Sequence, residues 1–163
     1  MLAVVGKQTG RMIKTRTDPW GRFAWSELRG ERDEGILVIS AYRVSQTKGT
    51  TAGPNTAYSQ QINQMIIEGD TDLDPRTRIL HDLGELITTK RGEGFRPILM
   101  MDANDDWLQT SSKAFKAFIE DMRLVDPYYE KFKTLGLTGT TYARGSRRID
   151  FIFVDSTTLP AIK

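Results

Sequence analysis

Residues 95–104 read Phe-Arg-Pro-Ile-Leu-Met-Met-Asp-Ala-Asn, and this stretch decides the fold class. Its centre, residues 98–101, is a short continuous apolar run, which is typical of a strand buried on both faces. The run stops at Asp102, where polar residues begin at once, and Asn104 follows two positions later. The pattern therefore predicts a buried strand that carries a carboxylate at its carboxyl end.

A second stretch, residues 147–154, reads Arg-Arg-Ile-Asp-Phe-Ile-Phe-Val and places Asp150 inside a predicted strand. By the two-residue period of strands, Asp150 shares a face with Arg148 and Ile152. A carboxylate among such hydrophobic residues is costly unless it is paired, hydrogen-bonded or bound to a metal. One reading is a structural salt bridge between Asp150 and Arg148. The other, which two such carboxylates in one small domain favour, is an active site.

Strands and helices are predicted on both sides of these two stretches. We expect strands over residues 1–6, 11–16, 22–29 and 36–42. The last two should form an antiparallel hairpin across the polar loop 30–35. Helical spacing and start signals predict helices over residues 58–66, from Asp74-Pro75 and from Ser111 or Ser112, and a short turn capped by Asp126-Pro127. From residue 11 on, the order β-β-β-α-α-β-α-β indicates an α/β fold with mixed strands.

The composition is that of one ordinary globular domain. The 163 residues are 39% hydrophobic and 27% charged, which excludes a disordered chain. The absence of cysteine excludes disulfides, thiolate catalysis and zinc fingers, and fits a reducing compartment. No apolar run approaches the roughly 20 residues of a membrane helix, and the first residues lack the features of a secretory signal. We therefore expect an intracellular protein, nuclear or cytoplasmic, with no membrane segment.

The net charge of +2 is too small to indicate nucleic-acid binding by itself. Its distribution is uneven, because Arg144, Arg147 and Arg148 cluster beside Asp150. Basic groups near a candidate site suit the binding of phosphate. The alternative is a solvated surface with an uneven charge distribution.

Three motifs, each at a predicted strand end, resemble one family. They are Ile-Ser-Ala-Tyr-Arg-Val at residues 39–44, Met-Asp-Ala-Asn at 101–104, and Thr-Thr-Tyr at 140–142 followed by residues 148–153. Their order and spacing resemble the endonuclease/exonuclease/phosphatase family, whose Gly-Asp-x-Asn motif has Met for Gly in this chain. The family comprises metal-dependent phosphoesterases, including the apurinic/apyrimidinic endonucleases and the endonucleases of non-LTR retrotransposons. The resemblance implies a four-layer α/β sandwich with mixed, largely antiparallel sheets.

The resemblance also implies roles for four residues. Asp102 resembles the residue that activates water near the metal, and it is a possible metal ligand. Asn104 resembles its orienting and stabilising partner, although Asx residues also merely shape loops. Asp150 resembles the Asp that orients a catalytic His. Tyr42 resembles the Tyr whose hydroxyl contacts a nonbridging phosphate oxygen, although a strand aromatic often only packs in the core.

Four more residues are candidates for binding substrate. Arg43 could contact phosphate, although its family match is looser. Tyr142 could line the substrate groove, as could Trp107, but aromatic residues beside loops more often serve packing. Arg148 is the fourth candidate, unless it pairs with Asp150.

Two parts of the family pattern are missing from residues 1–163. The family has a metal-binding Glu with a preceding Asn before the first motif, and a Ser-Asp-His strand after the last one. The only histidine of this chain is His81, which the spacing places on a helix surface. We therefore expect a single partial domain, truncated at both ends. We expect it to bind Mg²⁺ or Mn²⁺ weakly and to show no turnover by itself.

The function expected from the resemblance is divalent-metal-dependent phosphodiester hydrolysis, with DNA or another phosphodiester as substrate. A DNA endonuclease of the retroelement type is favoured, and its parent polypeptide could carry a reverse transcriptase. One alternative is a phosphoinositide or sphingolipid phosphoesterase. Another is a degenerate fragment without catalytic activity.

Overall fold

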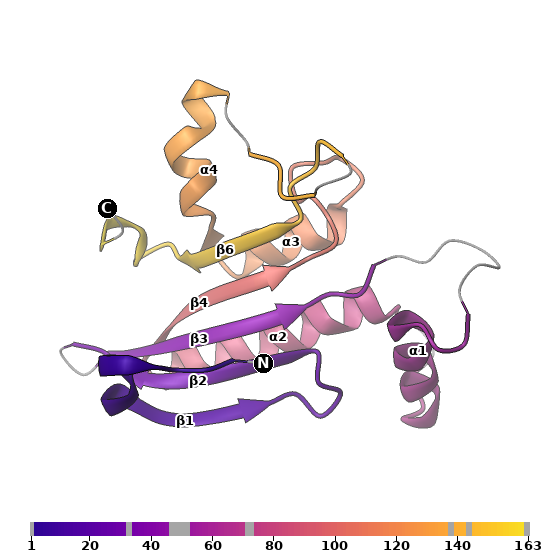
Figure 1. Ribbon diagram of the computed structural model, residues 1–163, viewed down its shortest axis with the longest axis horizontal. Helices are drawn as coiled ribbons and strands as arrows, with labels where there is room; N and C mark the ends of the chain where they lie inside the picture. Colours follow the sequence, from indigo (N-terminus) through magenta and orange to yellow (C-terminus); the bar gives the residue numbers. More distant parts are fainter. Residues whose placement is uncertain are drawn as a thin grey trace.

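The computed structural model describes residues 2–31, 34–45, 53–70, 74–136, 139–142 and 145–161. One sheet of six strands organises them, in the order β1-β2-β3-β4-β6-β5 (Figure 1). The strands are β1 (Met12–Thr17), β2 (Phe23–Arg29), β3 (Gly35–Tyr42), β4 (Phe95–Asp102), β5 (Leu124–Val125) and β6 (Asp150–Asp155). The α-helices are α1 (Ala57–Ile67), α2 (Pro75–Gly92), α3 (Lys113–Asp121) and α4 (Pro127–Phe132). Short 3-10 helices are η1 (Gly6–Arg11), η3 (Lys133–Leu135) and η4 (Leu159–Ala161).

The sheet is mixed and largely antiparallel, as predicted. Strands β3 and β4 are parallel, whereas the β1–β2, β2–β3, β4–β6 and β5–β6 pairs are antiparallel. A parallel pair needs a long crossover connection, which the chain supplies with α1 and α2. The carboxyl ends of β3 and β4 therefore lie side by side, together with the start of β6.

The core lies between one face of the sheet and helices α2 and α3, which Figure 1 shows behind the strands. Alternate strand residues point into it and are fully buried, such as Leu37, Leu99 and Phe153. From the helices, Leu83 and Phe115 fill the same cluster. Each such side chain contributes about 1.5–3 kcal/mol by leaving water. This core fixes which strand residues point to the opposite face.

The helix starts follow the capping signals of the sequence. Asp74 accepts hydrogen bonds from the backbone N–H groups of Arg76 and Thr77, and Pro75 takes the first helical position of α2. Asp126 accepts one from the N–H of Tyr129 at the start of α4. The predicted starts of α2 and α4 are confirmed. None of the described helices has both the length and the apolar character that crossing a bilayer would require.

Three details of the predicted elements are wrong. Residues 2–5 have no regular structure and residues 6–11 form η1, so no strand precedes β1. The two-residue strand β5 was not predicted, because so short a segment carries no periodicity. Strand β6 begins at Asp150 rather than at residue 147. Of the predicted loop 30–35, residues 32 and 33 lie outside the described residues, and the hairpin around it is confirmed.

Candidate functional site

Tyr42, Asp102 and Asp150 form a row across three strands at one end of the sheet. Tyr42 is the register partner of Asp102 in the β3–β4 pair, and Asp102 is the partner of Asp150 in the β4–β6 pair. Neighbouring strands lie about 4.8 Å apart. Because Leu99 and Met101 point into the core, the three residues of the row lie on the opposite face. The structure thus brings together the three polar strand ends that the sequence predicted, and we call them the acidic row.

Asp102 is the half-buried member of the acidic row. Burial raises its pKa above the usual value, a hydrogen bond from the backbone N–H of Asn104 opposes that rise, and the charge of Asp150 adds to it. The N–H lies 3.2 Å from Asp102 Oδ1. Within the part of the chain that the structure describes, neither Asp102 nor Asp150 has a cationic partner. The two carboxylates are therefore neighbours without countercharge.

Asn104 turns the chain at the end of β4. Its backbone has φ +46°, in the left-handed region that Asn adopts more readily than most residues. Its side-chain Nδ2 donates to the carbonyl oxygen of Arg43 at 2.8 Å, which ties this turn to the end of β3. The contacts show Asn104 shaping a loop beside the acidic row. Its predicted role in stabilising phosphate stays a prediction.

Arg43 is buried, and its guanidinium is used within the fold. Nη1 donates to Asp105 Oδ2 at 2.8 Å and Nε to the carbonyl oxygen of Arg76 at 2.9 Å. Arg76 Nη2 donates to the same Asp105 oxygen at 2.9 Å. The guanidinium of Arg43 also lies 5.4 Å from the ring centre of Phe115. These contacts give Arg43 a structural role and argue against the predicted contact with phosphate.

Arg148 pairs with Asp126 rather than with Asp150. Its Nη1 and Nη2 donate to the two carboxylate oxygens of Asp126, the second at 3.2 Å. Its guanidinium lies 4.7 Å from the ring centre of Tyr128 and 4.8 Å from that of Phe151. The suggested salt bridge with Asp150 is therefore wrong, because α4 brings a better-placed carboxylate. The guanidinium of Arg148 is used to bind Asp126 at the start of α4, which argues against its predicted contact with substrate.

A polar cleft of about 670 Å³ adjoins the acidic row at the turn of Asn104. Tyr142 lines it with 37% of its surface exposed, and Arg147 lies over the Tyr142 ring at 5.9 Å. Arg147 and Lys113 are exposed cations of this cleft and have no carboxylate partner among the described residues. Arg144, expected nearby, lies outside the described residues. Lys113 was not predicted, since a lone lysine at a helix start carries no signal of its own.

Trp107 packs rather than lining this cleft. It is partly buried against the hydrophobic core, and its ring meets Tyr129 edge-on at 5.3 Å. The packing alternative is therefore confirmed for Trp107.

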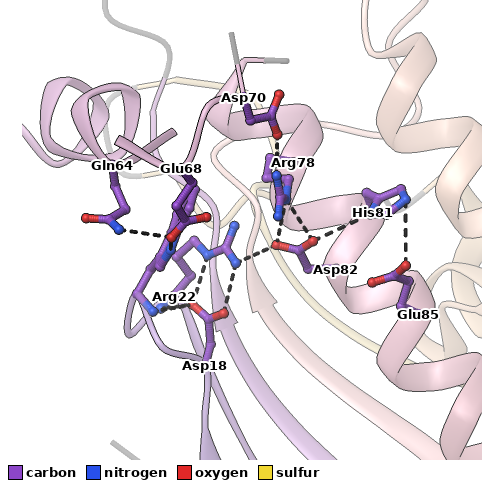
Figure 2. Close-up of polar contacts among 10 residues, drawn as sticks. Asp18, Arg22, Gln64, Glu68, Asp70, Arg78, His81, Asp82 and Glu85 are labelled. Carbon is purple, nitrogen blue, oxygen red and sulfur yellow. Dashed lines mark hydrogen bonds and ion pairs between the residues drawn. The ribbon is translucent and has the colours of Figure 1, made fainter. Parts of the chain in front are cut away.

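His81 lies on the surface of α2, as predicted, with its side chain 60% exposed. Its ring, Asp82 and Glu85 present ligand atoms within 4.8 Å of one another (Figure 2). Arg22 and Arg78 hold Asp82 at 2.5 and 2.9 Å. Burial alone would raise the pKa of Asp82, but these two guanidiniums lower it below its usual value. The charge of Asp82 is thus already neutralised, which makes this cluster a poor cation site.

Comparison with known proteins identifies the fold. No protein-family model matches the sequence, and no curated protein matches it. The 3′-5′ exonuclease NExo from Neisseria meningitidis superposes with a TM-score of 0.58 at 17% identity, over 93% of this chain and 62% of NExo. The chain has the endonuclease/exonuclease/phosphatase fold. The predicted fold class and resemblance are confirmed at this level.

Two further structures share this endonuclease/exonuclease/phosphatase fold. The human Nocturnin catalytic domain with bound sulfate has a TM-score of 0.55 at 12% identity, over 89% of this chain and 48% of that one. A Neisseria NExo described as a 3′ phosphatase bound to a product DNA hairpin has a TM-score of 0.55 at 16% identity, over 91% and 60%. The chain therefore spans between 48% and 62% of the lengths of these three structures.

Proposed function

We propose that this chain supplies part of the site of a divalent-metal-dependent phosphodiesterase that acts on DNA. The observation that carries the proposal is the acidic row: two neighbouring carboxylates and an exposed tyrosine at one sheet end, without countercharge among the described residues. Carboxylates elsewhere in the molecule, such as Asp82, Asp105 and Asp126, are held by arginines. A pair left free at a strand end is available to a cation or a water molecule.

In this proposal each polar group acts on one part of a phosphodiester. Asp102 positions and deprotonates the attacking water. The hydroxyl of Tyr42 and the amide of Asn104 contact the phosphate oxygens without adding negative charge. Asp150 orients a catalytic imidazole, which the position of His81 on α2 does not provide. Arg147 and Tyr142 line the polar cleft through which the DNA strand would pass.

The donor set suits a hard cation. The charge of Asp150 helps to raise the pKa of Asp102, and a cation between such carboxylates relieves this repulsion. Oxygen ligands favour Mg²⁺, or Mn²⁺ in its place, with Asp102 as the residue that would hold it. When bound, the metal stabilises charge on the phosphate and the leaving group. We propose weak binding, because residues 102 and 150 are few ligands for such an ion.

DNA is favoured as the substrate because a structure of the same fold holds a product DNA hairpin. The sequence motifs further favour an endonuclease of the retroelement type, whose parent polypeptide could carry a reverse transcriptase. Residues 1–163 would then be one partial domain of that polypeptide, without turnover by themselves.

Nicking of supercoiled plasmid tests this proposal. The assay uses residues 1–163 alone, and a longer protein that adds a Glu-bearing strand before them and a Ser-Asp-His strand after them. We expect metal-dependent nicking by the longer protein and none by residues 1–163. Asp102→Ala and Asn104→Ala should each lower the nicking rate at least about a hundredfold. Full activity in both variants would contradict the proposal.

Phosphate release from small esters separates the substrate classes. Release from such esters or from phospholipids without plasmid nicking would replace DNA as the substrate and would leave the hydrolytic site intact. Circular dichroism of the variants is the control for folding.

A further inference from the structure

A second cavity lies on the other side of Tyr42 from Asp102. It measures about 440 Å³, which falls within the roughly 300–1,000 Å³ of pockets for small ligands. One wall is the turn of residues 19–22 between β1 and β2, and the other is α1. Tyr42 lines it as well, so this pocket borders the acidic row. We call it the α1 pocket.

The wall that α1 supplies is made of amides. Residues 57, 60, 61, 64 and 68 line the pocket, and their spacing of three, one, three and four positions is that of one helix face. Three of them are glutamines, Gln60, Gln61 and Gln64, whereas Ile66 and Ile67 on the same helix are 57% and 77% exposed. A surface helix ordinarily turns its apolar face inward. In α1, Met65 points inward and is 1% exposed, and the three glutamines form a separate face that lines the pocket.

The opposite wall holds an indole in a fixed position. Trp20 Nε1 donates to Glu68 Oε1 at 2.8 Å, and Gln64 Nε2 donates to the same oxygen at 2.9 Å. The guanidinium of Arg22 lies 4.2 Å from the centre of the Trp20 ring. These bonds join the turn to the end of α1, and Figure 2 shows the one between Gln64 and Glu68.

Arg22 anchors this wall to the body of the protein. Its Nε and Nη2 each donate to Asp18 at 2.8 Å, and Nη2 also donates to Asp82 of α2 at 2.5 Å. Its side chain is only 3% exposed, so the network is shielded from water. These bonds tie the turn that forms one wall of the pocket to α2, and a preorganised wall favours ligand binding.

One amide of the pocket is unengaged. Gln64 is bonded to Glu68, and Gln60 donates at 3.4 Å to the carbonyl oxygen of Asn55. The side chain of Gln61 makes no hydrogen bond with any residue that the structure describes. It is only partly exposed and lines the pocket. Its side chain offers a donor and an acceptor side by side.

We propose that the α1 pocket binds a nucleobase of the nucleic-acid strand, next to the phosphate that the acidic row engages. This inference rests on the proposed function for its substrate. A glutamine amide pairs in two places with the N6 and N7 edge of adenine, and aromatic side chains stack on unpaired bases. Gln61 therefore reads the base edge, Trp20 contributes an aromatic surface, and an adenine is preferred. In this proposal the acidic row hydrolyses the phosphodiester, and base recognition in the α1 pocket determines which phosphodiester of the strand is hydrolysed.

Binding of a mononucleotide tests the pocket without any catalysis. ¹⁵N-labelled residues 1–163 are titrated with deoxyadenosine 5′-monophosphate in EDTA, and with 2-deoxyribose 5-phosphate as the ligand without a base. We expect the indole N–H of Trp20 and the side-chain amide of Gln61 to shift with the nucleotide alone. Equal shifts with the sugar phosphate, or no shift with either ligand, would overturn the proposal.

A matched pair of variants on the same helix sharpens the test. Gln61→Ala should weaken nucleotide binding about tenfold, since a good two-point contact discriminates by about 1–3 kcal/mol. Asn63→Ala removes an exposed amide outside the pocket and should leave the affinity unchanged. Equal losses in the two variants would overturn the role of Gln61.

The outcome separates this inference from the proposed hydrolysis. Nucleotide binding at the pocket without plasmid nicking by the longer protein would support the pocket and overturn the hydrolysis. Nicking with no nucleotide-dependent shift would overturn the pocket alone.

Discussion

Asp102 and Asp105 lie three residues apart at the end of β4, and their surroundings shift their pKa values in opposite directions. Burial would raise the pKa of Asp105, but the Ser112 hydroxyl and the guanidiniums of Arg43 and Arg76 lower it below the usual value. Burial raises the pKa of Asp102, and the Asp150 carboxylate across the strand pair raises it further.

The two carboxylates differ in whether their charge is paired within the fold. Asp105 joins the end of β3 to the start of α2 through buried arginines, which have side chains 5% and 9% exposed. Asp102 forms no ion pair with any described residue, and its neighbour across the β4–β6 pair is the carboxylate of Asp150. Unfavourable electrostatics of this kind persist where a binding partner relieves them. We therefore propose a chemical role for Asp102, whereas Asp105 has a structural one.

The largest expected effect is that of Asp105→Asn on stability. Removing one charge from a mostly buried cluster leaves two guanidiniums uncompensated, which we expect to cost about 2–4 kcal/mol. Urea unfolding followed by circular dichroism measures it. An unchanged unfolding midpoint would show that Asp105 contributes no more than a surface ion pair.

The pH dependence of this loss is the next test. Because the folded-state pKa of Asp105 is lowered, its contribution is present above the unfolded-state pKa of about 3.9 and is lost as the pH falls through the folded-state value. The stability difference between the wild type and Asp105→Asn should therefore be constant near neutral pH and vanish in acid. A difference that does not shrink as the pH falls below the unfolded-state pKa would assign the loss to packing.

Asp102→Asn should have the opposite sign and a smaller size. The folded-state pKa of Asp102 is raised, so its ionised form disfavours folding once the pH exceeds the folded-state value. Without metal at pH 7 the variant should melt at the same temperature or up to about 3 °C higher. Calorimetry in EDTA measures this, and a clear drop in melting temperature would give Asp102 a structural role.

The smallest expected effect is that of Asp150→Asn on its neighbour. Without the Asp150 charge, the pKa of Asp102 should fall toward its usual value, because that charge is one of its causes. NMR titration of the Asp102 carboxyl carbon detects the change. An unaltered titration would mean that burial alone sets the pKa of Asp102.

Local signals in the sequence predicted most of the fold. The Asp74-Pro75 start of α2, the β2–β3 hairpin and the buried run of β4 are each encoded within a few residues. The acidic row was also predictable, because its members end or begin strands. The strand predicted over residues 1–6 is wrong because a short apolar run fits a strand as well as an irregular segment.

Long-range pairing was not predictable from one sequence. Arg43 meets Asp105 across 62 positions, and Arg148 meets Asp126 across 22. Nothing in the pattern distinguishes these carboxylates from others of the same type, so Arg43 and Arg148 could be expected at the substrate. The pocket between α1 and the turn of Trp20 was not predictable either, because Trp20 and Glu68 meet across 48 positions.

Paramagnetic broadening by Mn²⁺ locates the cation site proposed at the acidic row. Increasing amounts of Mn²⁺ are added to ¹⁵N-labelled protein, and the amide resonances that broaden first locate the ion. We predict weak binding centred on Asp102 and Asp150, which Asp102→Asn abolishes. Broadening centred on His81, Asp82 and Glu85, or unaffected by Asp102→Asn, would contradict it.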